Sequence, residues 1–150
     1  MYPIILAAHN ILRWVVMILL IITIVRAYLG WFGKRKWTER DRKFGVFTGV
    51  ALDVQFLLGL LLYFFFSPLT RTALQNFGQA MQVADVRFFA LEHVLYMILA
   101  VVFAHLASVF ARKAVTPEGK HKLAAIWFSL AFLMIIMGMP WMRPLLPGLG

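Results

Sequence analysis

Four long apolar runs dominate the chain, and short polar connections separate them. The runs cover residues 4–30, 44–66, 88–111 and 123–139. Each comes close to or exceeds the roughly 20 helical residues that cross a bilayer core of about 30 Å. We therefore predict one all-α domain over residues 1–150 with four membrane spans. Connections this short favour an integral membrane four-helix bundle of up-down-up-down topology.

Polar residues in the connections predict where three of the helices begin. Thr38-x-x-Asp41 resembles a capping box, so the second helix is expected to start inside the first connection. Asp85 is the expected N-cap of the third span, because a carboxylate there can accept from free backbone N–H groups. Thr116 followed by Pro117 predicts the start of the fourth helix, since proline is tolerated at the first helical position.

The composition excludes most soluble proteins. Hydrophobic residues make up 63% of the chain and charged residues 14%, which is too apolar for a soluble core with a polar shell. The chain has no cysteine, so disulfides, thiolate metal sites and iron–sulfur clusters are excluded. Histidine and methionine remain as soft metal ligands, and soluble enzyme folds are not expected.

The cations are distributed unequally between the connections. Of the 15 Lys and Arg residues, only Arg71, Arg87 and Arg143 fall on the side of the second connection, and Arg13 lies within a span. The positive-inside rule then places the first and third connections in the cytoplasm and both termini outside a bacterial inner membrane. Cations confined to short loops indicate topology and not nucleic-acid binding. Those on the inner side are Arg26, Lys34, Arg35, Lys36, Arg40, Arg42, Lys43, Arg112, Lys113, Lys120 and Lys122.

Two histidines within the spans match in depth. Polar groups in hydrocarbon are costly, which makes them functional candidates. His9 and His93 lie about equally far from the outer face, within about one helical turn. The first and third helices of such a bundle are diagonal, roughly 14 Å apart if neighbouring axes are about 10 Å apart. That gap suits a flat macrocycle with an imidazole on each side of its metal, whereas zinc needs three or four protein ligands.

Other polar residues leave alternatives open. Arg13 lies one turn below His9 and could bind a cofactor carboxylate or pair with Asp53. His105 is a possible second site: it could be a packed histidine, a single axial ligand, or half of a site that a partner chain completes. His121, between two lysines, is expected to be interfacial and solvated, and its depth does not match that of His105.

The opening of two spans resembles a known class of protein. With His9-Asn10-x-x-Arg13-Trp14 in the first span and Glu92-His93 in the third, the chain resembles small four-helix bacterial membrane proteins described as cytochrome b-like. More distantly it resembles di-haem cytochromes b that pass electrons between quinones and haem. The resemblance implies that His9 and His93 are axial ligands. The di-haem proteins use two complete histidine pairs. Because the second pair is incomplete in this chain, we expect it to bind one haem b.

The expected function is one-electron transfer, with quinol as a candidate donor. The sequence leaves open whether the protein is an enzyme; if it is, it would be an electron-transfer component of a membrane oxidoreductase. One alternative is a structural or pigment-binding accessory subunit of a respiratory or photosynthetic complex, holding a chlorophyll-type pigment. Another is a small transporter using Asp53, Arg13 and Glu92. Besides the lipid bilayer, expected partners are other membrane subunits or further copies of the chain.

Overall fold

The computed structural model describes residues 1–143, and every regular element among them is a helix. Four continuous helical segments are long and apolar enough to cross a membrane: Tyr2–Phe32, Glu39–Phe66, Ala84–Lys113 and Pro117–Gly138. The first is α1 (Tyr2–Phe32). The second combines α2 (Glu39–Leu61) with the π-helix η1 (Leu62–Phe66). The third joins α5 (Ala84–Arg87), the π-helix η2 (Phe88–Glu92) and α6 (His93–Lys113), and the fourth is α7 (Pro117–Gly138).

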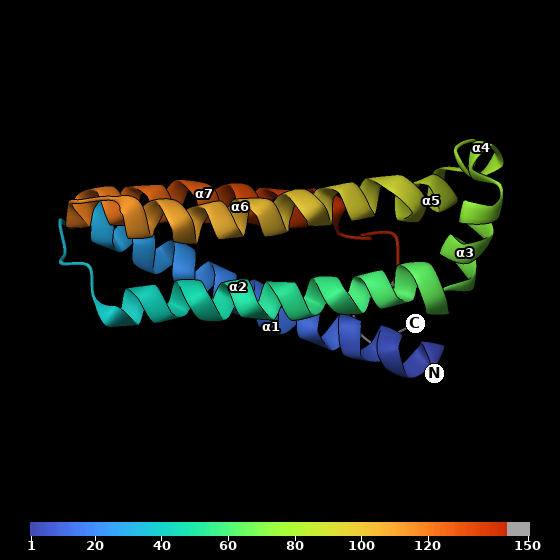
Figure 1. Ribbon diagram of the computed structural model, residues 1–150, viewed down its shortest axis with the longest axis horizontal. Coiled ribbons are helices and arrows are strands. Elements are labelled where there is room, and N and C mark those ends of the chain that lie inside the picture. Colours follow the sequence, from blue (N-terminus) through green and yellow to red (C-terminus); the bar gives the residue numbers. More distant parts are fainter. Residues whose placement is uncertain (144–150) are drawn as a thin grey trace.

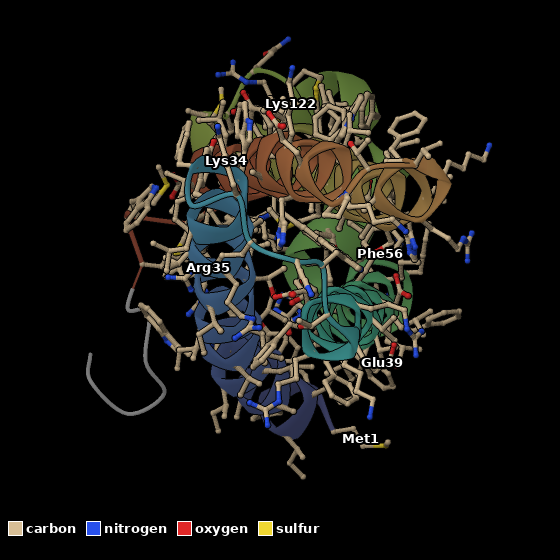
Figure 2. All side chains as sticks on the ribbon, turned by 90° about the vertical axis from the view of Figure 1, so that its left-hand side faces the viewer. Met1, Lys34, Arg35, Glu39, Phe56 and Lys122 are labelled. Carbon is tan, nitrogen blue, oxygen red and sulfur yellow. The ribbon has the colours of Figure 1, made fainter. Side chains whose placement is uncertain are left out.

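The long helices pack as a ring of four. The main contacts join α1 to α2, α2 to α6, α6 to α7 and α7 to α1, so α1 and α6 lie diagonally, as do α2 and α7. Both short connections lie at one end (Figure 1), together with Lys34, Arg35 and Lys122 (Figure 2). The N-terminus lies at the other end, where α3 (Pro68–Gln75) and α4 (Phe77–Ala80) connect the second and third long segments.

Two of the three predicted helix starts are confirmed. The Thr38 side chain accepts from the backbone N–H of Asp41, and the Asp41 carboxylate accepts from the N–H of Thr38 at 2.9 Å. Thr116 caps α7, with Pro117 as its first residue. The prediction for Asp85 is wrong, because Val83 is the N-cap of α5. Asp85 lies in the first turn, where its charge offsets the positive end of the helix.

Small side chains bring α6 and α7 close together. Alanines at helical spacing form the buried face of α6, and further alanines of α7 lie against them. Because these alanines carry only a methyl group, the backbones of α6 and α7 can approach closely and gain dispersion contacts. Transmembrane helices commonly pack in this way. The fully or almost fully buried alanines of α6 and α7 are Ala100, Ala104, Ala107, Ala111, Ala124, Ala125 and Ala131.

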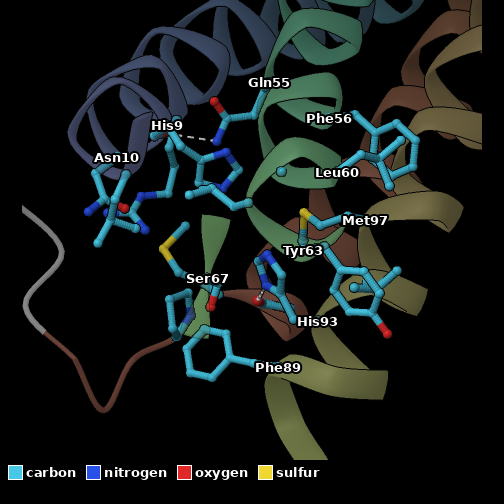
Figure 3. A pocket seen from close by; sticks show the side chains of 18 of the residues that line it. His9, Asn10, Gln55, Phe56, Leu60, Tyr63, Ser67, Phe89, His93 and Met97 are labelled. Atoms are coloured by element: carbon cyan, nitrogen blue, oxygen red, sulfur yellow. Dashed lines mark hydrogen bonds between the residues drawn. The ribbon is translucent and has the colours of Figure 1, made fainter. Parts of the chain in front are cut away.

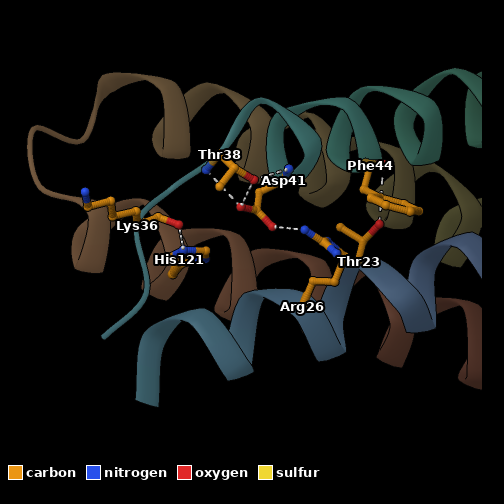
Figure 4. A network of polar contacts seen from close by, with 7 residues as sticks. All are labelled: Thr23, Arg26, Lys36, Thr38, Asp41, Phe44 and His121. Atoms are coloured by element: carbon orange, nitrogen blue, oxygen red, sulfur yellow. Dashed lines mark hydrogen bonds and ion pairs between the residues drawn. The ribbon is translucent and has the colours of Figure 1, made fainter. Parts of the chain in front are cut away.

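Hydrogen bonds tie α1 to α2 near the end with the short connections. The hydroxyl oxygens of Thr23 and Thr48 lie 2.8 Å apart, and both residues are buried. Arg26 donates to Asp41 at 2.7 Å (Figure 4). Since the same carboxylate belongs to the capping box, one residue both starts α2 and attaches it to α1.

His121 is buried, so the expectation that it is solvated is wrong. Only 1% of the residue is exposed. Its ring lies directly over Gly30 of α1, 4.9 Å from the Trp37 ring between centroids, and its Nε2 lies 3.5 Å from the Lys36 carbonyl. The physical reason is that His121 begins the face of α7 that packs on α1, although its sequence neighbours are charged.

Candidate functional site

A cavity forms beyond the end of α7. The helix has 22 residues, whereas the other three segments have 28 to 31. At about 1.5 Å per residue α7 is shorter than its neighbours by roughly 9 Å or more. The space next to its end is a cavity of about 290 Å³ lined by residues from all four long segments (Figure 3). This volume is at the lower end of the range of ligand pockets.

His9 and His93 face each other in this cavity (Figure 3). The ring centroids lie 6.5 Å apart and the ring planes are inclined by 69°. One residue comes from α1 and the other begins α6, the two diagonal helices. The structure thus brings together the two histidines that the sequence matched by depth.

One hydrogen bond fixes the orientation of His93. Its Nδ1 donates to the backbone carbonyl of Gly138 at 2.7 Å. Gly138 is the last residue of α7, where carbonyl groups have no partner within the helix. Because the carbonyl can only accept, Nδ1 carries the proton and Nε2 keeps its lone pair. Metal-ligating histidines usually donate their other ring N–H to a carbonyl or carboxylate in the same way.

His9 is positioned by α2. The Gln55 side chain donates to the backbone carbonyl of His9 at 3.0 Å. Gly59 leaves room for the ring, since a Cβ at that position would lie 3.2 Å from Cε1 of His9. The buried Nδ1 of His9 has no hydrogen-bond partner among residues 1–143. A buried nitrogen without a hydrogen-bond partner lowers the stability of the fold. Such unsatisfied groups are rare in native proteins, and a binding site is one explanation for them.

The spacing of the two rings suits a single metal between them. A metal–imidazole bond is about 2 Å long, so the two ring centroids would be roughly 6 Å apart across one metal. The observed 6.5 Å is close to that distance. Residues 1–143 contain no group of three or more His, Cys, Asp or Glu side chains that could hold a metal ion. A macrocycle that supplies four ligands of its own needs only two from the protein, so two histidines are as many protein ligands as a haem requires.

Arg13 adds a positive charge to the cavity. It is buried, lines the same cavity as His9 and His93, and places its guanidinium 5.9 Å from the Trp14 ring centroid. A buried guanidinium is well suited to bind a carboxylate through charge-assisted hydrogen bonds. Asp53, the alternative partner that the sequence suggested, is bonded to His105.

Two π-helices border the cavity, and sequence reasoning missed both. Residues of η1 and η2, including Tyr63 and Phe89, line it, and the Tyr63 hydroxyl donates to the Ala90 carbonyl at 2.7 Å, which joins the two π-helices. Single π turns inside α-helices are frequent at functional sites. One feature of the sequence fits this geometry. Arg87 and Glu92 are five residues apart, the spacing of one π-helical turn, and they form an ion pair at 2.8 Å.

His105 and His121 lie in different surroundings. Nε2 of His105 lies 2.8 Å from Oδ1 of Asp53, so one ring nitrogen is already engaged. His121 is enclosed by Gly30 and Trp37 at the end with the short connections. The structure therefore does not pair these two histidines around a common ligand.

Comparison with known proteins finds no relative of this chain. No family model matches it, and neither does a curated protein or a solved structure. The geometry of the His9–His93 cavity is therefore the basis for a functional proposal.

Proposed function

We propose that the protein is a membrane haem b protein that transfers single electrons, and that His9 and His93 would hold the haem iron. The observation that carries this proposal is the facing ring pair, 6.5 Å apart between centroids. The hydrogen bond from His93 to Gly138 supports the proposal, because it occupies Nδ1 and leaves the lone pair of Nε2 available to bind a metal. When bound, haem b supplies an iron that alternates between the ferric and ferrous states.

The chain's own residues fix the ligands and shield them. The Gly138 carbonyl holds the His93 ring and raises its basicity as a ligand. Gly59 allows the His9 ring to lie against α2, and Arg13 binds a carboxylate substituent of the cofactor. Most of the exposed cavity wall is apolar, which keeps water from the ligand nitrogens. Rings held this firmly move little when the charge between them changes, which favours fast electron transfer.

We further propose how the protein lies in the membrane. The four long segments cross a bacterial inner membrane as an up-down-up-down bundle, with the short connections in the cytoplasm and both termini outside. The basic residues of the first and third connections support this orientation, because they gather at one end. Since the chain has no cysteine, Arg40→Cys and Gln79→Cys provide unique labels. An impermeant thiol reagent on intact cells should label only Gln79→Cys, and labelling of only Arg40→Cys would reverse the orientation.

A membrane-soluble quinol is the proposed electron donor. The cavity is lined by the first residues of α1 and by η2, so it lies toward the end opposite the basic connections, near the ion pair of Arg87 and Glu92. Oxidation of one quinol to quinone releases two electrons and two protons, so it would reduce the haems of two chains. Glu92 of each chain is exposed enough there to take one of the two protons. Anaerobic addition of a short-chain quinol to the oxidised protein should reduce the haem within seconds to minutes. Reduction by dithionite but not by quinol would contradict this choice of donor.

Optical spectroscopy tests the haem proposal directly. The purified protein should show a Soret band, sharp α and β bands on reduction, and one extractable haem b per chain. His9→Ala and His93→Ala should each abolish the low-spin spectrum, whereas the matched control His105→Ala should keep it. A colourless protein after haem supplementation, or an extracted chlorophyll-type pigment, would contradict the proposal. The second result would instead favour a pigment-binding accessory subunit.

A further inference from the structure

An acid–base pair lies on the outer surface of the helix ring. Asp53 of α2 and His105 of α6 are bonded at 2.8 Å, yet 41% and 54% of their side chains are exposed. The bond uses Oδ1 and Nε2. Within residues 1–143 the second carboxylate oxygen and Nδ1 make no hydrogen bond. An electrically neutral Asp53–His105 pair holds two protons, one of them in the bond between Nε2 and Oδ1, so one of the two free atoms is a donor and the other an acceptor.

The pair is too deep to reach water in a membrane. His105 lies seven residues before Arg112, and Asp53 ten residues after Lys43, which places both roughly 10–15 Å from the basic end. That depth is inside a hydrocarbon core of about 30 Å. Long lysine and arginine side chains can extend to the interface from such depths, but these two side chains are short. Lipid would therefore leave their free polar atoms unsatisfied at considerable cost.

The rest of the outer surface at this depth is apolar. The exposed side chains in the middle of α1 and α7 are aliphatic, for example Ile18, Ile21, Ile126 and Leu133. On α6, Ile98 and Val102 continue the His105 side at helical spacing, and on α2 the exposed Val50 and Leu57 flank Asp53. The Asp53–His105 face, meaning Asp53 and His105 with Val50, Leu57, Ile98 and Val102, therefore differs from the other outer faces.

We propose that a second copy of this chain covers the Asp53–His105 face. Copies inserted in the same orientation are related by a two-fold axis along the membrane normal, so equivalent residues meet at equal depth. His105 Nδ1 of each copy then bonds to the free Asp53 oxygen of the other, with one proton in each of the four bonds, so that each Asp53–His105 pair is electrically neutral. The face is self-complementary because it carries one donor and one acceptor, and the resulting ring alternates carboxylates and imidazoles. The two bonds satisfy all four exposed polar atoms.

A different membrane protein would fit less well. It would need its own donor and acceptor at the same depth and spacing, whereas a second copy provides both automatically. Interhelical hydrogen bonds of this kind stabilise transmembrane association when the alternative is an unsatisfied group in lipid. The proposal concerns the outer surface and is independent of haem binding.

Cysteine cross-linking in native membranes tests the dimer. The chain has no cysteine, so Val102→Cys, one turn from His105, provides a single reactive site on the proposed face. Ile18→Cys on α1 is the matched control, since both valine and isoleucine are exposed aliphatic residues. We expect a short thiol cross-linker to give a homodimer with Val102→Cys and little with Ile18→Cys.

A second variant tests whether the polar pair is the cause. Asp53→Leu with His105→Leu suits lipid and should leave the monomer folded, while dimer formation falls about tenfold or more because both intermolecular hydrogen bonds are lost. Subunit counting by single-molecule photobleaching in bilayers should give two for the unsubstituted protein. Single-step bleaching, equal cross-linking of the two cysteine variants, or a cross-link to another polypeptide would each overturn the proposal. Haem content, measured on the same samples, tests the His9–His93 site separately.

Discussion

Replacing Gly30 with alanine tests how tightly His121 packs on α1. The added Cβ would lie 2.5 Å from Cγ of the His121 ring and closer still to Nδ1 and Cε1. Carbon atoms in ordinary contact are about 3.5–4.0 Å apart, so the ring and α1 must separate by about 1.5 Å. The ring has little freedom to turn away, because Trp37 lies against it and only 1% of His121 is exposed.

Two opposing contributions set the size of the effect. Overpacking a buried contact costs about 1–3 kcal/mol, whereas alanine in place of glycine stabilises a helix by about 0.5–1 kcal/mol. Gly30→Ala should therefore lower the free energy of unfolding by about 1–2 kcal/mol. Gly49→Ala is the matched control. Apart from the neighbouring residues and backbone of α2 itself, no atom lies within 4 Å of a Cβ at Gly49, so this variant should be as stable as the parent or more stable.

Reversible unfolding in mixed micelles, with increasing mole fraction of a denaturing detergent, measures these free energies. His121→Ala opens space for the new methyl group, so Gly30→Ala should cost less in that background. The two substitutions should show a coupling free energy of about 1 kcal/mol or more, as expected for residues in contact. Additive effects, or a Gly30→Ala variant as stable as Gly49→Ala, would refute the packing argument.

Two other substitutions give sharp expectations. Thr48→Val keeps the side-chain shape but removes the hydrogen bond to Thr23, so it should lower the free energy of unfolding by about 0.5–1.5 kcal/mol; detergent unfolding measures this, and no loss would show that the bond contributes nothing. Gly59→Ala brings a methyl group to 3.2 Å from the His9 ring, so haem titration should show severalfold weaker binding with little change in protein stability. Gly49→Ala should bind haem like the parent, and equal affinities of both variants would contradict the role of Gly59.

The helices were predictable because their signals are local. The apolar runs predicted four long helices, and the structure contains them with ends shifted by a few residues. Thr38-x-x-Asp41 and Thr116-Pro117 are caps, which depend only on residues within one turn. The prediction that Asp85 is an N-cap was wrong, because an acidic residue is equally suitable inside the first turn of a helix. A single carboxylate therefore does not show which residue begins the helix.

The candidate site was predictable only in part. Matching depth along two helices was enough to suggest that His9 and His93 meet, because helix rise is constant. The bond from His93 to Gly138 depends on where α7 ends relative to its neighbours, which the sequence of α6 does not contain. Likewise, the burial of His121 depends on a glycine about 90 residues away. Contacts of this kind follow from the packing of whole helices and have no local signal.

The π-helix η2 has a consequence for the register of its segment. The His93 N–H bonds to the Phe88 carbonyl, five residues earlier, so the segment contains one more residue than an α-helix of similar rise. Such a turn is equivalent to a single-residue insertion, and it offsets the two α-helical frames on either side by about 100°. Deleting one residue between Phe88 and Glu92 would restore a continuous α-helix and rotate Arg87 and Phe88 around the axis relative to His93. Length variation of one residue at this point would thus change which side chains border the cavity while leaving the span intact.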